Sequence, residues 1–572
     1  CCNLNFNYKN VKIPTFFHNL KGFDGHLIID RLNDMNFSNI DIIAQNFEKY
    51  MTFSFGEFRF LDSMAFLSSS LDTLSSNLLK DGKDNFKHTL SQPNLTEEQQ
   101  DLLLCKGVYP YEYMDCNEKF HDTELPPIDK FYSTLGEENV SDKSYKHAQN
   151  VWNKFNIQNM GEYHDLYLKT DVLLLSDVFE NFRNTAMKHY GLDPANGYFT
   201  LPNFAWDAML KKTGIKLEQL TDVDKYLFCE KGLRGGTSMI SHRYARANNK
   251  YMKDYNVDET SSYIVYLDAN NLYGHAMIQK LPTGGFEWYD SKVISQLNRE
   301  FMSNKNAYNS WINSLDIMNE FGYFVECDLH YPKELHDIHN SYPLAVESKS
   351  INKSELSPYQ LNQLERHHEK HNESMKKLIP NFNDKERYVC HIRNLKYYIE
   401  KGLVITNIHR VLKFDQSDWL AKYINFNTDQ RAKSKNDFEK DFFKLMNNAV
   451  FGKTMENMRN RVKIDLVTDE KTYLKMVAKP QFDDKKVYGE NLVAVKMLPK
   501  VVKLNKPIYV GLTVLDLSKL HMYEFHYDYI VPKYGDKQQL LFTDTDSLCY
   551  HIQTDDVYKD MKIDSHLFDM AG

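Results

Sequence analysis

Two carboxylates stand close together late in the chain, in a short polar turn between two apolar runs. Leu540–Phe542 and Leu548–Ile552 flank Asp544 and Asp546, which lie in the turn 543–547. An apolar strand, a tight polar turn and a second apolar strand predict a β-hairpin with both carboxylates at its tip. Because neighbouring carboxylates repel each other where water is scarce, the pair indicates a cation; Mg²⁺ typically takes one or two carboxylates plus substrate phosphates. An ordinary solvated turn is the alternative interpretation.

A third carboxylate follows another apolar strand, much earlier in the chain. Tyr263–Leu267 predicts a buried strand that delivers Asp268 at its end. Beside the hairpin acids, Asp268 would complete a carboxylate cluster for two metal ions. Two such ions lower the barrier for a 3′-hydroxyl that attacks phosphorus, and they stabilise the departing pyrophosphate.

A predicted helix within residues 437–461 adds positive charge. Lys440, Lys444 and Asn448 recur every four residues and so share one face, while apolar side chains cover another. A lysine stripe that merely faces water is the alternative. The cations that precede and follow this helix favour a place where a triphosphate could lie: Arg431, Lys433, Lys435 and Lys453.

These three stretches resemble, in the same order, the polymerase motifs of family B DNA polymerases. D-A-N-N-L-Y at 268–273 resembles the family's D-x2-S-L-Y-P, and K-L-M-N-N-A-V-F-G at 444–452 resembles K-x3-N-S-x-Y-G. F-T-D-T-D-S at 542–547 resembles Y-x-D-T-D-S. Asn271, Gly274, Ala449 and Phe451 depart from the family's residues, but the acids, the lysine, the asparagine and an aromatic ring are kept.

The resemblance implies a DNA-directed DNA polymerase that transfers deoxynucleotides to a primer 3′-hydroxyl with two Mg²⁺ ions, or with Mn²⁺. Asp268 and Asp546 would ligate both ions, and Asp544 would support the site from beside them. Primer-template DNA and deoxynucleoside triphosphates are the implied partners. The implied nucleotide-binding residues are Lys444 and Arg431 at the triphosphate, Tyr273 under the sugar, where it rejects a 2′-hydroxyl, and Asn448, Phe451 and Gly452 along the nascent base pair.

Two other segments resemble the second and third exonuclease motifs of the same family. They are H-N-L-K-G-F-D at 18–24 and Y-L-K-T-D at 167–171. The family's first exonuclease motif, D-x-E, has no place in this sequence, so we expect an incomplete site that does not proofread. The resemblance implies that Asp24 and Asp171 hold metal ions, that Tyr167 orients the attacking water, and that Asn19 and Phe23 contact the primer end.

Two further stretches are candidates for DNA contact. Residues 231–253 carry six lysines and arginines and no acid, and tyrosines lie between them, as on a surface that follows phosphates. A solvated basic loop is the alternative. Within this stretch Leu233, Arg234, Gly235 and Gly236 resemble the family's template-binding Y-x-G-G motif, with Leu233 for the tyrosine. Ser63-Met64 resembles the S/T-L segment that grips single-stranded DNA.

The long intervals between the polymerase motifs resemble the two insertions of the protein-primed branch of the family. Segments 322–345 and 506–530 are most similar to those of Polinton-type enzymes. A terminal priming protein is then a further partner. The expected fold is a multidomain α+β and α/β chain: an RNase H-like exonuclease domain followed by the palm and fingers of a right-hand polymerase, without a thumb. The expected segments are 1–200 exonuclease-like, 201–260 linker and template-binding, 261–285 palm, 286–425 first insertion, 426–460 fingers, 461–510 second insertion and 511–572 palm with the hairpin.

Composition sets outer bounds on these expectations. The chain has 572 residues and a formal net charge of −8, which argues weakly against DNA binding, although local basic faces matter more than the total. Its 8 cysteines form no C-x-x-C pair, which is typical of a reducing, intracellular compartment, nucleus or cytoplasm, and not of a secreted protein. We expect no membrane span. We also expect the sequence to be a fragment without the ends of the full protein.

Two other functions fit parts of the sequence. A decayed remnant of a mobile element would bind DNA without catalysing extension. A metal-dependent glycosyltransferase also holds a nucleotide diphosphate with a D-x-D turn, but it requires neither the helix that carries Lys444 nor the exonuclease-like acids.

Overall fold

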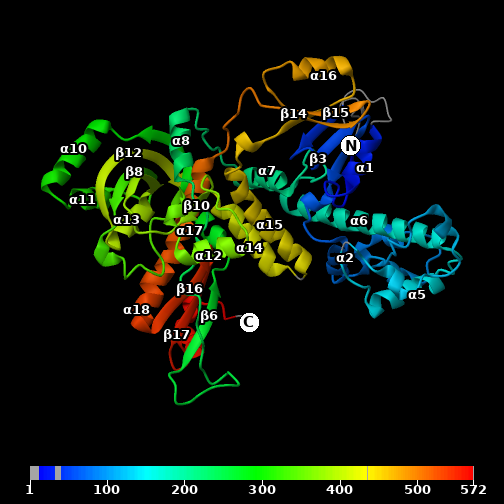
Figure 1. Ribbon diagram of the computed structural model, residues 1–572, viewed down its shortest axis with the longest axis horizontal. Helices are drawn as coiled ribbons and strands as arrows, with labels where there is room; N and C mark the ends of the chain where they lie inside the picture. The colour runs from blue at the N-terminus through cyan, green and yellow to red at the C-terminus, as the bar shows by residue number, and fades with distance from the viewer. Residues whose placement is uncertain (1–11, 33–39, 135, 435, 571–572) are drawn as a thin grey trace. The chain divides into compact units, whose positions relative to one another are not determined.

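The computed structural model describes residues 12–32, 40–134, 136–434 and 436–570 (Figure 1). The chain forms two compact units. The first comprises Cys1–Lys212, Phe426–Lys453 and Asn457–Lys503, and the second comprises Thr213–Asn425, Thr454–Glu456 and Leu504–Gly572. A search of the described helices finds none with the length and apolar character needed to cross a bilayer.

The first unit is built on a four-stranded sheet in the order β1-β4-β3-β2. β1 (Ile13–Phe17) and β4 (Phe58–Asp62) are parallel, and β3 (Tyr50–Phe55) and β2 (Asp41–Ala44) continue the sheet in antiparallel fashion. The helices of this unit besides those discussed below are α1 (Asp24–Leu32), α2 (Leu71–Leu79), α3 (Lys87–Leu90), α4 (Glu97–Leu103), α5 (Asp142–Lys154), α7 (Leu201–Thr213) and α16 (Glu470–Val477).

Apolar residues at three- and four-residue spacing predict a helix over about Glu162–Tyr190 that stops at Gly191, and the structure confirms it as α6 (Met160–Tyr190). Asn159 caps its start by accepting a hydrogen bond from the Glu162 amide, and Gly191 ends it at a φ of 63° that favours glycine. The same spacing predicts a core-facing stripe of Leu168, Val172, Leu175, Val178 and Phe182. This stripe is wrong in its first half, where Leu168 and Val172 are 53% and 56% exposed. Neighbouring segments cover a different face there, whose buried residues are Met160, Tyr163 and Thr170.

The second predicted insertion folds as a three-stranded sheet in the order β13-β15-β14. Its strands are β13 (Lys463–Val467), β15 (Leu492–Met497) and β14 (Phe482–Gly489). They share one hydrophobic core with the first sheet, because Ile464 and Leu492 belong to the same buried cluster as Ile29 and Phe53. The Tyr488 hydroxyl also donates to the carbonyl of Phe47 at 2.6 Å. The predicted second insertion therefore contributes to the core of the first unit.

Two helices of the predicted fingers, α14 (Ala421–Lys433) and α15 (Asp437–Thr454), pack on the end of α6. A buried polar chain joins them: the Tyr190 hydroxyl donates to Asn427 Oδ1 at 2.6 Å, and Asn427 Nδ2 donates to Asn447 Oδ1 at 2.7 Å. Phe182 and Phe442 meet edge to face beside it. Buried polar groups are costly unless paired, so this network fixes how α15 lies on α6.

The second unit contains an antiparallel sheet in the order β5-β16-β17-β6. Its strands are β5 (Ser238–Ile240), β16 (Gln538–Asp544), β17 (Ser547–Gln553) and β6 (Ser262–Asp268). The helix α17 (Ile508–Glu524), almost wholly buried, packs against α9 (Leu272–Met277), which follows β6. The sheet and these helices form the base on which the carboxylates stand.

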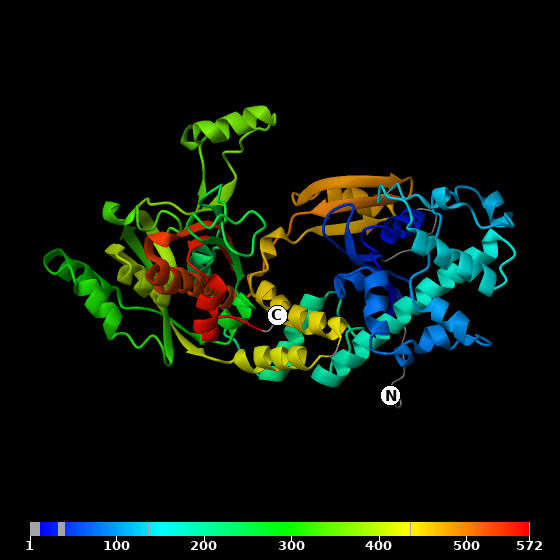
Figure 2. The same ribbon diagram turned by 90° about the horizontal axis from the view of Figure 1, so that it is seen from below.

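Three strands of the first predicted insertion form a second sheet with β7, which begins in the predicted palm segment, in the order β11-β8-β12-β7. Its strands are β11 (Lys385–His391), β8 (Phe321–His330), β12 (Val404–Ser417) and β7 (Leu281–Trp288). A strand pair, β9 (Glu347–Ser350) with β10 (Lys376–Ile379), carries α12 (Pro358–Arg366) outward from this unit (Figure 2). The remaining helices of the unit are α8 (Val223–Gly232), α10 (Ser291–Ser303), α11 (Ala307–Ser314), α13 (Ile392–Glu400), α18 (Val531–Tyr534) and α19 (Val557–Ile563).

Candidate active site

The predicted hairpin is present, with its two aspartates at the tip. β16 and β17 pair in antiparallel fashion, and the last pair before the turn is Asp544 with Ser547. Leu540, Leu548 and Tyr550 anchor the hairpin in the core, where each is at most 1% exposed. The apolar flanks seen in the sequence therefore hold the polar tip at the edge of the sheet.

Asp268 lies beside this tip. In the register of β6 and β17, Asp268 faces Ser547, and the amide of Ala269 donates to the carbonyl of Asp546 at 2.7 Å. Asp268 and Asp544 are exposed, and Asp546 is half-buried. The structure thus brings together three carboxylate residues from two distant parts of the sequence.

Two residues behind the acids, the same face of the sheet becomes apolar. The aligned positions there are Tyr266, Cys549, Phe542 and Ile240, one on each strand. The rings of Tyr266 and Phe542 are 5.8 Å apart. Tyr266, Phe542 and Ile240 are exposed, so the acids border an open apolar platform.

The turn after Asp268 explains two departures from the family's residues. Asn271 has a φ of 55°, a conformation that asparagine tolerates better than most residues, and it precedes α9. Its side chain lies against Gly274, where an added Cβ would come within 1.9 Å of Asn271 Nδ2. Asparagine at 271 and glycine at 274 therefore belong together, because a larger residue at 274 would collide with the folded asparagine.

Tyr273 reaches the acid cluster. Its pKa is raised, first by burial of the ring and then by the negative charge of Asp546. The half-buried phenol therefore experiences the charge of the hairpin acid, and both residues belong to the same unit as Asp268.

The predicted template-binding segment packs directly on the hairpin, but Arg234 does not face outward. Arg234 is 8% exposed; its guanidinium donates to the carbonyl of Val389 at 2.7 Å and lies over the ring of Tyr388. Direct phosphate contact by the Arg234 side chain is therefore a wrong prediction, because the guanidinium is used inside the fold. Gly235 and Gly236 follow it, and Gly236 lies so close to the hairpin turn that an added Cβ would meet Thr545.

The basic stretch 231–253 is also less available than its composition suggests. Lys231 pairs with Glu326 at 2.8 Å, Lys250 with Asp556 at 2.6 Å, and Arg246 with Asp254 at 3.3 Å. The partner acids come from outside the stretch or from its edge. A window of sequence without acids therefore does not predict an unpaired positive surface.

Comparison with known proteins decides the family. A family model described as DNA polymerase type B, organellar and viral, matches residues 2–531. The chain belongs to this family of DNA polymerases. It is accordingly a DNA-directed DNA polymerase of type B. A search of curated proteins finds no match.

Several solved structures are similar to this chain at low sequence identity. Phi29 DNA polymerase with primer-template DNA and incoming nucleotides has a TM-score of 0.48 and 15% identity, over 96% of this chain and 73% of that one. The orthorhombic crystal form of Phi29 DNA polymerase gives a TM-score of 0.49 and 14% identity over the same shares.

The acids of the polymerase suit a divalent cation, which the family implies as a cofactor. Asp268, Asp544 and Asp546 offer hard oxygen donors at an open edge, the donor type that Mg²⁺ prefers. No group of three or more His, Cys, Asp or Glu side chains that could hold a metal by itself occurs within the described ranges. Mg²⁺ often binds through one or two carboxylates and takes its remaining ligands from water and substrate phosphates, so the residues fit it.

The fingers residues of the polymerase keep the predicted polar face. Lys444, Asn448 and Arg431 are exposed, while Phe442 and Met446 on the opposite face of α15 are buried. Phe451 is half-buried and Gly452 exposed near the end of the same helix. Lys444 belongs to the first unit and the carboxylates to the second, so their approach to one another stays a prediction.

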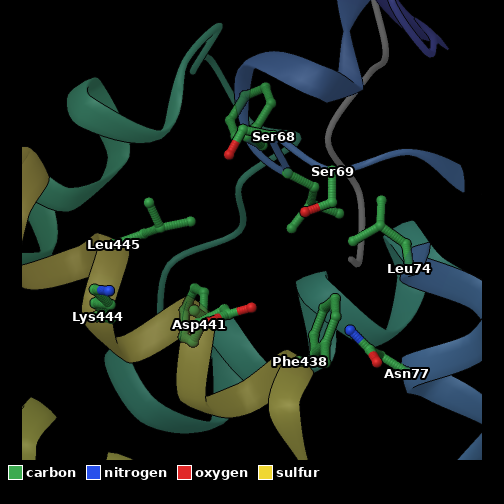
Figure 3. Close-up of a pocket in the computed structure, with 11 residues that line it drawn as sticks. Ser68, Ser69, Leu74, Asn77, Phe438, Asp441, Lys444 and Leu445 are labelled. Carbon is green, nitrogen blue, oxygen red and sulfur yellow. The ribbon is translucent and has the colours of Figure 1, made fainter. Parts of the chain in front are cut away.

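Lys444 also borders a cavity of about 200 Å³ within the first unit. Figure 3 shows Asp441, Lys444 and Leu445 of α15 on one side and Ser68, Ser69 and Asn77 on the other. α15 therefore lies along the segment that follows Ser63 and along α2.

The exonuclease-like residues divide between two places in the first unit. Asp24 begins α1, and its pKa is raised by burial and by the nearby charge of Asp62. Asn19 has a φ of 69°, and its side chain lies against Gly22. Phe23 is 66% exposed. These residues follow β1, and the Phe23 ring is exposed; their contact with a primer end stays a prediction.

Tyr167 and Asp171 lie on α6 among aromatic and charged neighbours. The Tyr167 hydroxyl hydrogen-bonds that of Tyr111 at 2.6 Å, and its ring stacks on Tyr109. Burial raises the pKa of Asp171, against the opposing charge of Lys106, whose Nζ lies 3.9 Å from Asp171 Oδ2. Lys106 was missed in the sequence because a single lysine in a mixed loop carries no pattern.

Ser63 is inside the fold, so its predicted side-chain contact with DNA is wrong. It is 0% exposed, and its hydroxyl donates to the carbonyl of Phe17 at 3.0 Å. The preceding Asp62 organises this region instead. Its carboxylate accepts from the amides of Asn19 at 3.0 Å, Lys21 at 3.2 Å and Met64 at 2.9 Å. An acid directly after the predicted strand Phe58–Leu61, in which only Arg59 is polar, was the available signal.

Proposed function

We propose that the polymerase transfers deoxynucleotides to a primer 3′-hydroxyl at Asp268 and Asp546 by two-metal-ion chemistry. The observation that carries this proposal is the register of β6 and β17, in which Asp268 faces Ser547 beside the hairpin tip. Two Mg²⁺ ions, when bound, would activate the attacking hydroxyl and stabilise the charge on the leaving pyrophosphate. Asp268 and Asp546 would hold these ions, and Asp544 would support them from the end of β16.

The other side chains position the nucleotide. Tyr273, half-buried near Asp546, would lie under the sugar and exclude a 2′-hydroxyl. Lys444 and Arg431 would offset the charge of the triphosphate, as exposed cations on successive helices. Asn448, Phe451 and Gly452 would follow along the nascent base pair, and Gly235 and Gly236 would lie along the template.

We also propose protein-primed replication of a viral or mobile-element genome, of the Polinton type. Both predicted insertions are folded segments: β8, β11 and β12 lie in the first, and β13–β15 in the second. A terminal priming protein would be the partner of the first insertion, with primer-template DNA and deoxynucleotides as in the Phi29 complexes. All six cysteines within the described ranges are free thiols, which supports an intracellular location.

The exonuclease-like residues are proposed to bind the primer end. Asp24 and Asp171 would hold metal there, Tyr167 would orient water, and Asn19 and Phe23 would contact the strand. Burial raises the pKa of both acids, a condition that a bound cation would reverse.

Primer extension with Mg²⁺ and four deoxynucleotides, on the wild type and Asp546→Ala, tests the main proposal. We expect extension by the wild type and its loss in the variant, with DNA retention unchanged in a gel-shift assay. DNA retention without extension in either protein would instead indicate an inactive remnant. Extension that survives Asp546→Ala would remove the proposed site. Hydrolysis of a nucleotide sugar without DNA binding would favour the glycosyltransferase.

A further inference from the structure

The turn that carries the hairpin acids has a backbone conformation that its central residue disfavours. Thr545 has a φ of 59°, and the amide of Asp546 donates to the carbonyl of Asp544 at 2.7 Å. A three-residue turn with positive φ is the strained form of the γ-turn. A β-branched residue in that region is an outlier that persists only when surrounding structure holds it.

The glycine segment holds this turn from one side. The Thr545 amide donates to the carbonyl of Thr237 at 2.8 Å, and Ser238 pairs with Asp544 across β5 and β16. Gly236 fits because it lacks a side chain: an added Cβ would meet Thr545 Cγ2 and Oγ1 at 2.4 Å and Cβ at 2.8 Å. Real Cβ atoms essentially never approach another heavy atom that closely, so a side chain at 236 would move the turn.

Buried charged groups anchor the glycine segment from behind. Lys519 Nζ donates to the carbonyl of Arg234 at 2.6 Å, and the Arg234 guanidinium donates to the carbonyl of Val389. Asp516, three residues before Lys519 on α17, accepts from the amide of His391 at 2.8 Å. Because these groups are buried and paired, displacing them is costly. The segment therefore presents Gly236 to the turn from a fixed position.

We propose that Gly236 is a positioning residue for nucleotidyl transfer: its contact with Thr545 sets the placement of Asp544 and Asp546 for the metal ions. The segment assigned to the template thereby acts on the metal-binding turn directly, with no residue between them. The inference rests on the proposed function of these two carboxylates.

The test compares two glycine variants of the full chain. Gly236→Ala puts a Cβ into Thr545, whereas a Cβ at Gly235 would meet nothing within 4 Å. We expect Gly236→Ala to lower kcat about 10- to 100-fold, because small misplacement of reacting groups has effects of that size. We expect it also to weaken Mn²⁺ binding, followed by the electron paramagnetic resonance signal of free Mn²⁺. Gly235→Ala should keep wild-type Mn²⁺ affinity, and any loss of template contact in it should appear in the Kd for primer-template.

A double variant separates positioning from a general loss of structure. Thr545→Gly removes the three atoms that the new Cβ would meet, and glycine accepts a positive φ without strain. Gly236→Ala combined with Thr545→Gly should therefore recover Mn²⁺ binding and kcat. Equal Mn²⁺ affinity in the two single glycine variants, or no recovery in the double variant, would overturn the inference. Asp546→Ala distinguishes a failure of this inference from a failure of the proposed function, because extension that survives Asp546→Ala would overturn the proposed active site itself.

Discussion

Asp268 and Ser547 face each other across β6 and β17, at the end of the sheet that carries the hairpin. The amide hydrogen bond from Ala269 to Asp546 continues this pairing into the turn. A shift of the register by one residue would point Asp268 to the opposite face of the sheet. The placement of the acids therefore depends on the whole length of the ladder, including its buried residues, and not on the tip alone.

Asp268→Asn should abolish extension while leaving the fold intact. The amide keeps the size of the side chain but removes the charge, so a metal bound as proposed would lose a principal ligand, and kcat should fall by about three orders of magnitude. Asp290→Asn is the matched control, because Asp290 caps α10 by accepting from the Lys292 amide and asparagine can do the same. Equal activity of the two variants in primer extension would contradict the assignment of Asp268.

Tyr273→Val should admit ribonucleotides. In the wild type the half-buried Tyr273 ring would occupy the space that a 2′-hydroxyl needs, and valine would leave that space open. We expect the ratio of kcat/KM for ribonucleotide over deoxynucleotide to rise by at least about tenfold, on the order of a single lost steric contact. Tyr273→Phe keeps the ring and should keep the discrimination. A ratio that rises equally in both variants would assign the selectivity to the hydroxyl instead of the ring.

Glu326→Gln should change how the second unit's stability depends on pH. Glu326 is 0% exposed; burial would raise its pKa, but hydrogen bonds from Lys231 and Arg410 prevail and lower it. Because the pKa is lower in the folded state, the carboxylate stabilises the fold at pH values above its pKa in the unfolded chain, about 4.3. This stabilisation is lost as the pH falls through the pKa of the folded state. At pH 7 the variant should lose about 2 kcal/mol, the scale of a disrupted buried charged hydrogen bond.

Urea unfolding at pH 7 and at pH 3.5, about one unit below the unfolded value, checks this. The free energies of unfolding of the wild type and Glu326→Gln should differ more at pH 7 than at pH 3.5, about one unit below the unfolded pKa. Glu334→Gln, which removes an exposed acid of the same unit, should leave both transitions close to wild type. A constant difference between wild type and Glu326→Gln at both pH values would show that Glu326 does not titrate as described.

Local patterns in the sequence predicted the elements that depend on neighbouring residues. The hairpin followed from two apolar runs around a polar turn, and the end of α6 followed from Gly191, which adopts a positive φ. Asp268 at a strand end followed in the same way. The order of the family motifs along the sequence then assigned these elements to one polymerase site.

Features that depend on distant contacts were not predictable from those patterns. Arg234 and Ser63 lie in family-like motifs, yet their side chains are buried by partners far along the chain, Val389 and Phe17. The close approach of Gly236 to Thr545 joins two residues that are far apart in the sequence, and no local pattern predicts it. The core shared by the second insertion and the first sheet is likewise visible only in the fold.

Lys444→Ala should weaken nucleotide binding more than it slows the chemical step. An exposed lysine on α15 would act as a point charge on the triphosphate, so its removal should raise KM for deoxynucleotides by about 10- to 100-fold. Lys440→Ala is the control from the same face one turn earlier, where Lys440 lies 3.6 Å from Asp437. Its effect on KM should be much smaller, because a partner acid already offsets its charge. Single-turnover extension over a range of nucleotide concentrations separates the two constants. Equal KM values for the two variants would mean that charge anywhere along this face suffices, and that Lys444 has no special role in nucleotide binding.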